Sequence, residues 1–206
     1  MLFRSKNVPV CKALVDNADK IKEEVLNFIH QPNVLLSYPK YKVTEDCDLY
    51  ENYWKACPVT DWISEEYLNF SSSPQQRDFF LFLVNRTKQH CPTITNIIKD
   101  LEEGGNVANG FISRLLPGTT IHPHRGWISG WVRTHLGLVC DPECKITVGD
   151  ETRTWEEGKL LAFHDWDYHS VKHTGTQERI VISIDIRITY LEKFILSSVN
   201  CSQRKY

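Results

Sequence analysis

Hydrophobic positions in the first half of the chain recur at intervals of three and four residues. Within residues 16–29, one face of a helix would carry Ala18, Ile21, Val25, Phe28 and Ile29. This spacing predicts an amphipathic helix that ends before Pro32. Residues 73–76 (Ser-Pro-Gln-Gln) have the cap, first-turn proline and returning glutamine of a second helix start. A third helix is predicted over 93–103, closed by the glycines at 104–105.

The pattern changes after about residue 105 to short β-rich segments separated by turn residues such as Pro117-Gly118 and Gly149-Asp150. The predicted strands are Phe111–Leu116, Trp131–Val139, Lys145–Val148, Lys159–Phe163 and Arg179–Ile186. This spacing is typical of an antiparallel barrel or sandwich. We therefore predict one mainly β domain over 1–206, with a mostly helical supporting part (1–105), a β core (106–190) and a C-terminal tail (191–206).

Charge and composition narrow the class of partner. The chain has 206 residues, with 24 Lys and Arg against 26 Asp and Glu, and no run of like charge, which disfavours nucleic acid and membrane surfaces. No stretch reaches the ~20 apolar residues of a spanning helix, and the opening lacks the apolar core of a signal peptide. We expect a cytoplasmic protein with reduced cysteines, Cys140 and Cys144 included, and a small-molecule or peptidyl substrate. The oligomeric state stays open.

Histidines gather in the β-rich part of the chain. Six of the eight fall between positions 122 and 173: His122, His124, His135, His164, His169 and His173. Neutral imidazole is the commonest protein ligand of transition metals, so the cluster is a candidate metal site. The alternative is a set of surface or hydrogen-bonded histidines. His122 and His124 could also be the paired histidines of a generic cupin site, although the remaining spacing of that motif is missing.

Two arginines are predicted to face inward. Alternation places Arg133 and His135 on one face of strand 131–139, opposite a face that carries Val132, Leu136 and Leu138. A buried guanidinium is costly unless it meets an anion. Arg179 opens an apolar strand and needs either a buried acid or a bound carboxylate. Taken one by one, each arginine could instead form a surface ion pair.

Several motifs at consistent intervals connect these residues. They are Leu116-Pro117-Gly118-Thr119, Pro123-His124-Arg125-Gly126, Arg133-Thr134-His135-Leu136-Gly137-Leu138, Asp150-Glu151-Thr152-Arg153-Thr154-Trp155-Glu156-Glu157-Gly158-Lys159 and Tyr168-His169-Ser170-Val171, with Arg179 ten residues after His169. With them, residues 107–186 resemble the aspartyl/asparaginyl β-hydroxylase family of iron(II)- and 2-oxoglutarate-dependent oxygenases. The resemblance implies a double-stranded β-helix, a cupin-like jelly roll, with supporting helices.

The resemblance also implies a metal site. His124 and His169 match the two metal-binding histidines of the family. Gly126 stands where related oxygenases carry a third, carboxylate ligand, a vacancy for which the family is known. Asp165 matches a family acid that orients metal-bound water or a ligand histidine, and it is the catalytic candidate.

The implied cofactors are Fe(II) and 2-oxoglutarate, with dioxygen as co-substrate. Arg133 and His135 match the family pair around the 1-carboxylate of 2-oxoglutarate. Arg179 matches the arginine that binds the 5-carboxylate, and Ser113 matches the hydroxyl beside it. The fork of a guanidinium suits a carboxylate bidentately.

The substrate is less defined. Where the animal hydroxylases carry an arginine associated with the substrate carboxylate, this chain has Trp131, which disfavours an aspartyl substrate. Trp127 and Trp131 are candidate substrate-pocket residues, with core packing as the alternative. The sequence thus indicates a dioxygenase that hydroxylates an unactivated carbon of an amino-acid, peptidyl or related substrate. The alternatives are a non-catalytic 2-oxoglutarate- or metal-binding regulatory protein on the same scaffold, or an acyl-chain (lipid) hydroxylase.

Overall fold

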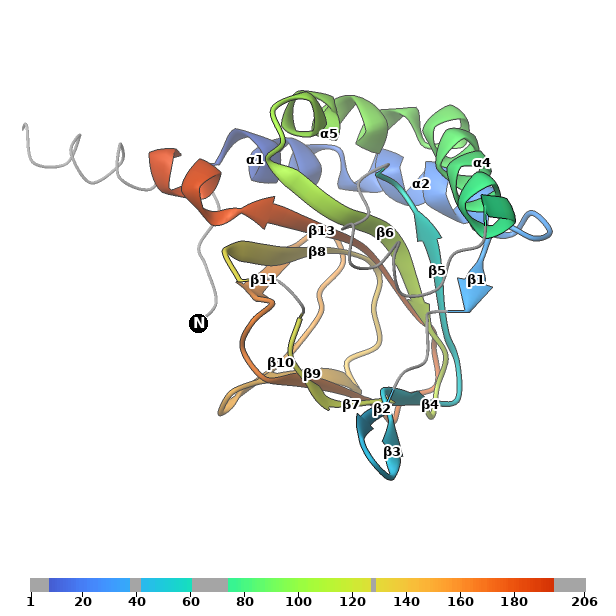
Figure 1. Ribbon diagram of the computed structural model, residues 1–206, viewed down its shortest axis with the longest axis vertical. Coiled ribbons are helices and arrows are strands. Elements are labelled where there is room, and N and C mark those ends of the chain that lie inside the picture. Colours follow the sequence, from blue (N-terminus) through green and yellow to red (C-terminus); the bar gives the residue numbers. More distant parts are fainter. Residues whose placement is uncertain (1–7, 38–41, 61–73, 127–128, 195–206) are drawn as a thin grey trace, which may run out of the picture.

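Two antiparallel sheets face each other in the computed structural model, which describes residues 8–37, 42–60, 74–126 and 129–194 (Figure 1). The larger sheet has the order β1 (Leu36–Ser37), β5 (Trp54–Pro58), β6 (Val107–Leu115), β13 (Arg179–Arg187), β8 (Trp131–Val139) and β11 (Leu160–His164). The smaller one has the order β10 (Glu151–Thr154), β9 (Cys144–Val148), β12 (His169–His173), β7 (Thr120–His124) and β4 (Tyr50–Glu51). Strands far apart in sequence are neighbours in both sheets, which confirms the predicted double-stranded β-helix.

Four helices among the described residues cover the outer face of the larger sheet (Figure 1). They are α1 (Pro9–Asp16), α2 (Ala18–Ile29), α4 (Pro74–His90) and α5 (Pro92–Glu103). The three predicted helices are confirmed, and α2 buries the predicted apolar face. At the end of α5, Gly105 takes a left-handed conformation (φ 61°) and the Asn106 N–H donates to the Leu101 carbonyl, as a glycine-terminated helix requires.

Strand alternation divides the apolar residues between two cores. In β13 the even-numbered Ile180, Ile182 and Ile184 pack against the helices, whereas Val181 faces the space between the sheets. Each fully buried aliphatic side chain contributes about 1.5–3 kcal/mol. Both faces of β13 are covered, which explains why its sequence is a nearly continuous apolar run. The strand pairs with β6 and β8 at the centre of the larger sheet.

The five predicted strands are confirmed as β6, β8, β9, β11 and β13, but other strands were not predicted. β7, β10 and β12 are rich in His, Thr and charged residues, so they lack a strong apolar pattern. The part predicted as mostly helical also contains β1, β4, β5 and the hairpin β2 (Lys42–Thr44) and β3 (Cys47–Asp48). These strands have two to five residues each, too few for periodicity to show.

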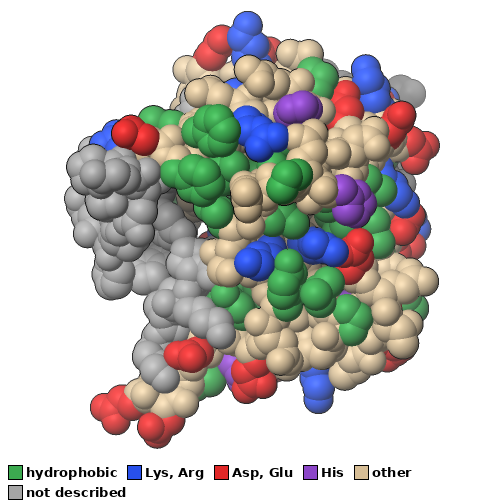
Figure 2. All heavy atoms as spheres, turned by 90° about the vertical axis from the view of Figure 1, so that its right-hand side faces the viewer, with side chains coloured by type: hydrophobic (Ala, Val, Ile, Leu, Met, Phe, Trp, Pro, Cys, Tyr) green, Lys and Arg blue, Asp and Glu red, His purple; other side chains and the backbone are tan. Residues whose placement is uncertain are grey.

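Exposed apolar side chains gather on α4. They belong to Phe79, Leu81 and Phe82, which are 42%, 40% and 52% exposed. Figure 2 looks at the side of the molecule where α4 lies, and green apolar side chains cluster in its upper part. This patch belongs to the helical layer. Within the described ranges, no helix has the length and apolar character needed to cross a membrane.

Candidate metal and cofactor site

His124 and His169 lie side by side at the ends of two neighbouring strands of the smaller sheet. Their Cα atoms are register partners, and their ring centroids are 4.2 Å apart. Between β7 and β12 the register shifts, so that His169 pairs with His124 but Val171 pairs with Ile121. This β-bulge places both Ile121 and His124 on the inner face, which strict alternation does not allow.

Both rings present the same nitrogen for coordination. Nδ1 of His124 is 2.8 Å from the His122 carbonyl, and Nδ1 of His169 is 2.8 Å from the Asp167 carbonyl. A carbonyl only accepts, so each Nδ1 carries the proton and each Nε2 keeps its lone pair. Burial lowers the pKa of His124 to about 3 and that of His169 to about 4, with the His169 ring contributing at His124. Both imidazoles are therefore neutral, the form that binds metal.

Asp165 fills the space beside Gly126. A Cβ built on Gly126 would come 1.7 Å from Asp165 Oδ2, so the aspartate carboxyl fills the space that a side chain at 126 would take. Asp165 Oδ1 is 3.7 Å from His169 Nε2. It lies 2.7 Å from Arg133 Nη1 as an ion pair, without an aligned hydrogen bond. The carboxylate is thus fixed beside the histidines.

Arg133 connects this aspartate to a second one that the sequence analysis missed. Its Nε and Nη2 donate to the two carboxylate oxygens of Asp185, each at 2.8 Å, and Asn109 donates to the same carboxylate at 3.3 Å. Burial raises the pKa of Asp165 and of Asp185 against the attraction of Arg133. The predicted inward arginine meets an anion, but that anion is a pair of protein carboxylates.

A second cation lies elsewhere between the sheets with no such partner. Arg179 is 2% exposed, its Nη1 donates to Ser113 Oγ at 3.3 Å, and its Nε has no hydrogen-bond partner. Among the described residues, no carboxylate forms an ion pair with it. Burial lowers the pKa of Arg179, and the guanidinium stacks on Trp155 at 4.8 Å. Such a group is suited to a carboxylate brought by a ligand.

His135 lies between Arg179 and the paired histidines. Its Nδ1 accepts a hydrogen bond from Trp155 Nε1 at 3.1 Å, so the ring proton sits on Nε2. The ring is 5.5 Å from that of Phe163, which is 5.0 Å from the ring of His169. Burial and the nearby Arg179 hold the pKa of His135 well below its usual value. Its Nε2–H is therefore a neutral donor.

His122 does not join this group. His122 points to the opposite side and pairs with Glu51 (Nε2–Oε1 3.1 Å), which excludes a site built on His122 and His124 together. Trp131 is 7% exposed at the start of β8, with the Arg187 guanidinium 4.6 Å from its ring centroid. Trp127 lies outside the described residues.

Sequence reasoning missed three supporting residues. Asp185 was hidden in an apolar run, although an acid at an inner position of a central strand signals a buried partner. Trp155 had no assigned role, and it contacts both His135 and Arg179. Trp54 donates from Nε1 to Ser113 Oγ at 3.0 Å. Ser113 thus accepts two N–H groups and keeps its own proton to donate.

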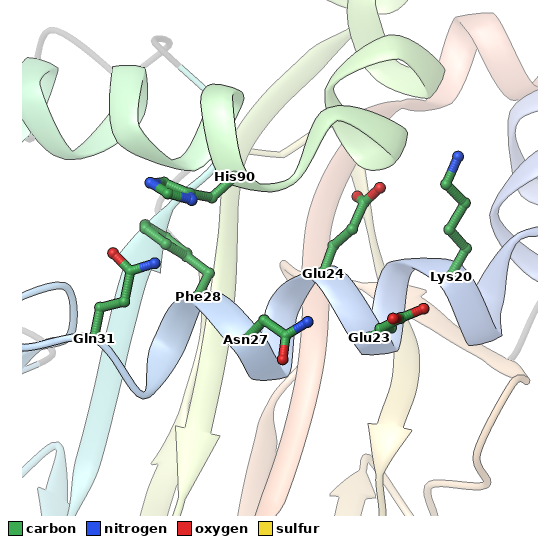
Figure 3. A pocket seen from close by; sticks show the side chains of 7 residues that line it. All are labelled: Lys20, Glu23, Glu24, Asn27, Phe28, Gln31 and His90. Atoms are coloured by element: carbon green, nitrogen blue, oxygen red, sulfur yellow. The ribbon is translucent and has the colours of Figure 1, made fainter.

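A separate hollow of 260 Å³ lies on the helical layer (Figure 3). In it the ring of Phe28 stacks on that of His90 at 5.2 Å. Glu24 also lines it, but its carboxylate accepts from the backbone and the hydroxyl of Thr93 in the first turn of α5. These contacts join α2 to α4 and α5, so the hollow marks a helix junction.

A jelly roll with two neutral histidines, a nearby aspartate and a buried arginine that has no described carboxylate partner defines a candidate metal- and carboxylate-binding protein of the double-stranded β-helix class. Among the described residues no group of three or more His, Cys, Asp or Glu is arranged to hold a metal ion. The family model described as Aspartyl/Asparaginyl beta-hydroxylase matches residues 15–188. The chain belongs to this family.

Curated proteins that are similar to this chain carry names of the same family. The chain is 30% identical over 197 residues to human Aspartate beta-hydroxylase domain-containing protein 2, covering 90% of this chain and 49% of that protein. It is 45% identical over 75 residues to mouse Aspartyl/asparaginyl beta-hydroxylase, covering 36% of this chain and 10% of that protein. The chain thus spans about half the length of the former. A solved predicted oxalate decarboxylase from Thermotoga maritima superposes with a TM-score of 0.41 at 10% identity, over 74% of this chain and 93% of that chain.

Gly126→Ala is expected to disturb the site through Asp165. The added Cβ would overlap the carboxyl group, so the aspartate must move, at a cost of about 1–3 kcal/mol in unfolding free energy. The double variant with Asp165→Ala removes the carboxyl and leaves the Asp165 carbonyl oxygen, 2.9 Å from the added Cβ, so it should recover most of that loss. Urea unfolding of both variants and of Asp165→Ala alone measures the coupling. Additive effects would contradict the proposed contact.

The metal-free protein is expected to lose stability as the pH falls below about 6.5. Histidines of the unfolded chain take up protons there, whereas His124 and His169 resist protonation until about pH 3 and about pH 4. Stability from these two groups is therefore complete above pH ~6.5 and declines below it, by up to about 2.7 kcal/mol per pH unit. The raised pKa values of Asp165 and Asp185 act in the opposite direction.

Urea unfolding at a series of pH values isolates the histidine contribution. The double variant His124→Gln, His169→Gln should show a shallower decline than the unsubstituted protein. His30→Gln, at an exposed histidine just after α2, is the matched control and should keep the full decline. Equal slopes in the double variant and the unsubstituted protein would mean that the two imidazoles are not buried as described.

Proposed function

We propose that this protein is an iron(II)- and 2-oxoglutarate-dependent dioxygenase that hydroxylates an unactivated carbon of an amino-acid, peptidyl or related substrate. Membership of a family named for β-hydroxylases supports the reaction type. The proposal rests on one observation above all. His169, which is buried, and His124, which is half-buried, are both fixed as neutral imidazoles with a free Nε2 lone pair. The same jelly roll buries an arginine with no described carboxylate partner.

Iron(II) is suited to this donor set. Its site would be formed by Nε2 of His124 and of His169, and the bound metal and 2-oxoglutarate supply the activation of dioxygen. Each imidazole is oriented by a backbone carbonyl, so neither ring needs to reorient on binding. Asp165, held by Arg133, would accept a hydrogen bond from a water beside the metal. Its carboxyl blocks a side-chain ligand at 126.

The 2-oxoglutarate dianion would be bound at two ends. Arg179 would pair with the 5-carboxylate through its unpartnered Nε–H, and the Ser113 hydroxyl, which accepts from two donors, would contribute its own proton. His135 would donate from Nε2–H at the 1-carboxylate end. Arg133 would favour an anion there through its charge, although three of its N–H groups already contact aspartates.

Calorimetric titration of 2-oxoglutarate into the anaerobic protein tests the proposal. Binding to the iron(II)-loaded protein should be much tighter than to the metal-free protein, because the metal adds a second anchor to the carboxylate site. Succinate should then form slowly once air is admitted. Absence of metal-dependent binding would overturn the proposal.

One observation favours the non-catalytic alternative enough to keep it in the test. In the structure Arg133 is already engaged by two aspartates, so a bound 1-carboxylate would compete with them. Tight metal-dependent binding of 2-oxoglutarate without succinate, with or without added peptides, would identify a sensor on this scaffold. Succinate formation would exclude it.

A further inference from the structure

A cation and two aromatic rings form an exposed cluster beside the paired histidines. The guanidinium of Arg125 lies 4.1 Å from the ring centroid of Tyr168 and 6.0 Å from that of Trp166. Trp166 is 46% and Tyr168 is 54% exposed, and Arg125 is exposed as well. Large aromatic side chains with this much exposure often mark a contact surface.

The cluster lies at the outer edge of the candidate site. Arg125 directly follows His124, and Tyr168 directly precedes His169. The N–H of Gly126 donates to the Asp165 carbonyl at 2.7 Å, which ties the segment after β7 to the turn between β11 and β12. The two histidines are more buried than the cluster, so a molecule that reaches them from solvent on this side passes it.

No described carboxylate neutralises the positive charge of Arg125. Its contacts among the described residues are the two ring stackings, and no described carboxylate pairs with it. Two other arginines differ, since Arg114 pairs with Glu178 and Arg153 with Glu151. A guanidinium stacked on a ring keeps its in-plane N–H groups available, and these suit a carboxylate bidentately.

We propose that Arg125, Trp166 and Tyr168 form a docking surface for a polypeptide substrate that carries a carboxylate side chain near the residue presented to the site. This rests on the proposed function and names its substrate class. Arg125 pairs with the carboxylate, and the two rings pack against neighbouring side chains of the peptide. Because Arg125 directly follows His124 in the chain, the acid lies within a few residues of the target.

The surroundings favour a peptide over a membrane. The turn that carries the two rings also contains Asp165 and Asp167. The N–H of Gly149 donates to the Tyr168 carbonyl, and Gly149 is followed in the chain by a further acid, Asp150. An anionic bilayer attracts several Lys and Arg residues together. A single guanidinium, that of Arg125, surrounded by acidic residues is instead suited to a single carboxylate of a peptide.

An array of short peptides tests the proposal without turnover. Each peptide has one fixed position, occupied by Asp, Asn or Lys, and degenerate positions elsewhere. Binding is measured with the metal-loaded protein and 2-oxoglutarate under nitrogen. We expect a preference for Asp over Asn at a fixed position, about five- to tenfold, that Arg125→Gln abolishes and Arg125→Lys weakens. Tyr168→Leu should lower affinity for all peptides.

Arg153→Gln, an exposed arginine on β10 that is paired with Glu151, is the matched control and should leave the preference unchanged. An Asp preference that survives Arg125→Gln would overturn the proposal. So would Arg125-dependent binding to phosphatidylserine vesicles with no peptide preference. The 2-oxoglutarate affinity of each variant is measured in parallel, so that failure of the cofactor site is recognised separately from failure of the docking surface.

Discussion

Replacement of His169 by alanine should abolish metal-dependent turnover of 2-oxoglutarate while the fold is kept. The variant removes one of the two imidazoles proposed to bind the metal. Loss of a residue that only hydrogen-bonds to a metal ligand lowers metal affinity by roughly 10- to 100-fold, so loss of the ligand itself should lower the affinity for iron(II) by at least about 100-fold. Anaerobic calorimetry with iron(II) alone measures the affinity. Circular dichroism verifies the fold, and succinate release measures turnover.

His122→Ala is the matched control for this prediction. It removes a histidine from the same strand as His124, but one that the bulge directs toward Glu51. Metal affinity should be unchanged in this variant. If His122→Ala weakens metal binding as much as His169→Ala does, the paired histidines of the site are not those described.

Replacement of Arg179 by methionine should separate function from stability. The affinity for 2-oxoglutarate should fall by about 10- to 100-fold, since a hydrogen-bonded charge contributes about 1.5–3 kcal/mol. The unfolding free energy of the ligand-free protein should not fall, and it should rise if the buried cation is a net cost there. Calorimetry measures the affinity, and urea unfolding measures the stability.

Two further variants define the role of this arginine. Arg179→Lys keeps the charge but loses the planar fork, so an intermediate affinity is expected. Arg114→Met removes an arginine on the outer side of β6 that pairs with Glu178, and it should leave 2-oxoglutarate binding unchanged. A large loss of stability in Arg179→Met with unchanged 2-oxoglutarate affinity would identify Arg179 as a purely structural residue.

Local patterns were enough to predict the elements whose burial is one-sided or complete. The apolar face of α2 and the continuous apolar run of β13 follow directly from helix and strand periodicity. The histidine-rich strands β7 and β12 were not predicted, because their polar side chains do not alternate with apolar ones as core residues do. The inward direction of Arg133 and His135 was predictable, since β8 has a regular alternation.

By itself the sequence determined the family, the jelly roll and the identity of the candidate ligands, because these depend on motifs and periodicity along the chain. Only the tertiary structure decided how the residues meet. The bulge between β7 and β12 separates His124 from His122, and the space left by Gly126 is filled by an aspartate 39 positions later. Asp185 engages Arg133, while Arg179 has no described acid partner. Such contacts depend on strand register and on the facing sheet, which no local pattern encodes.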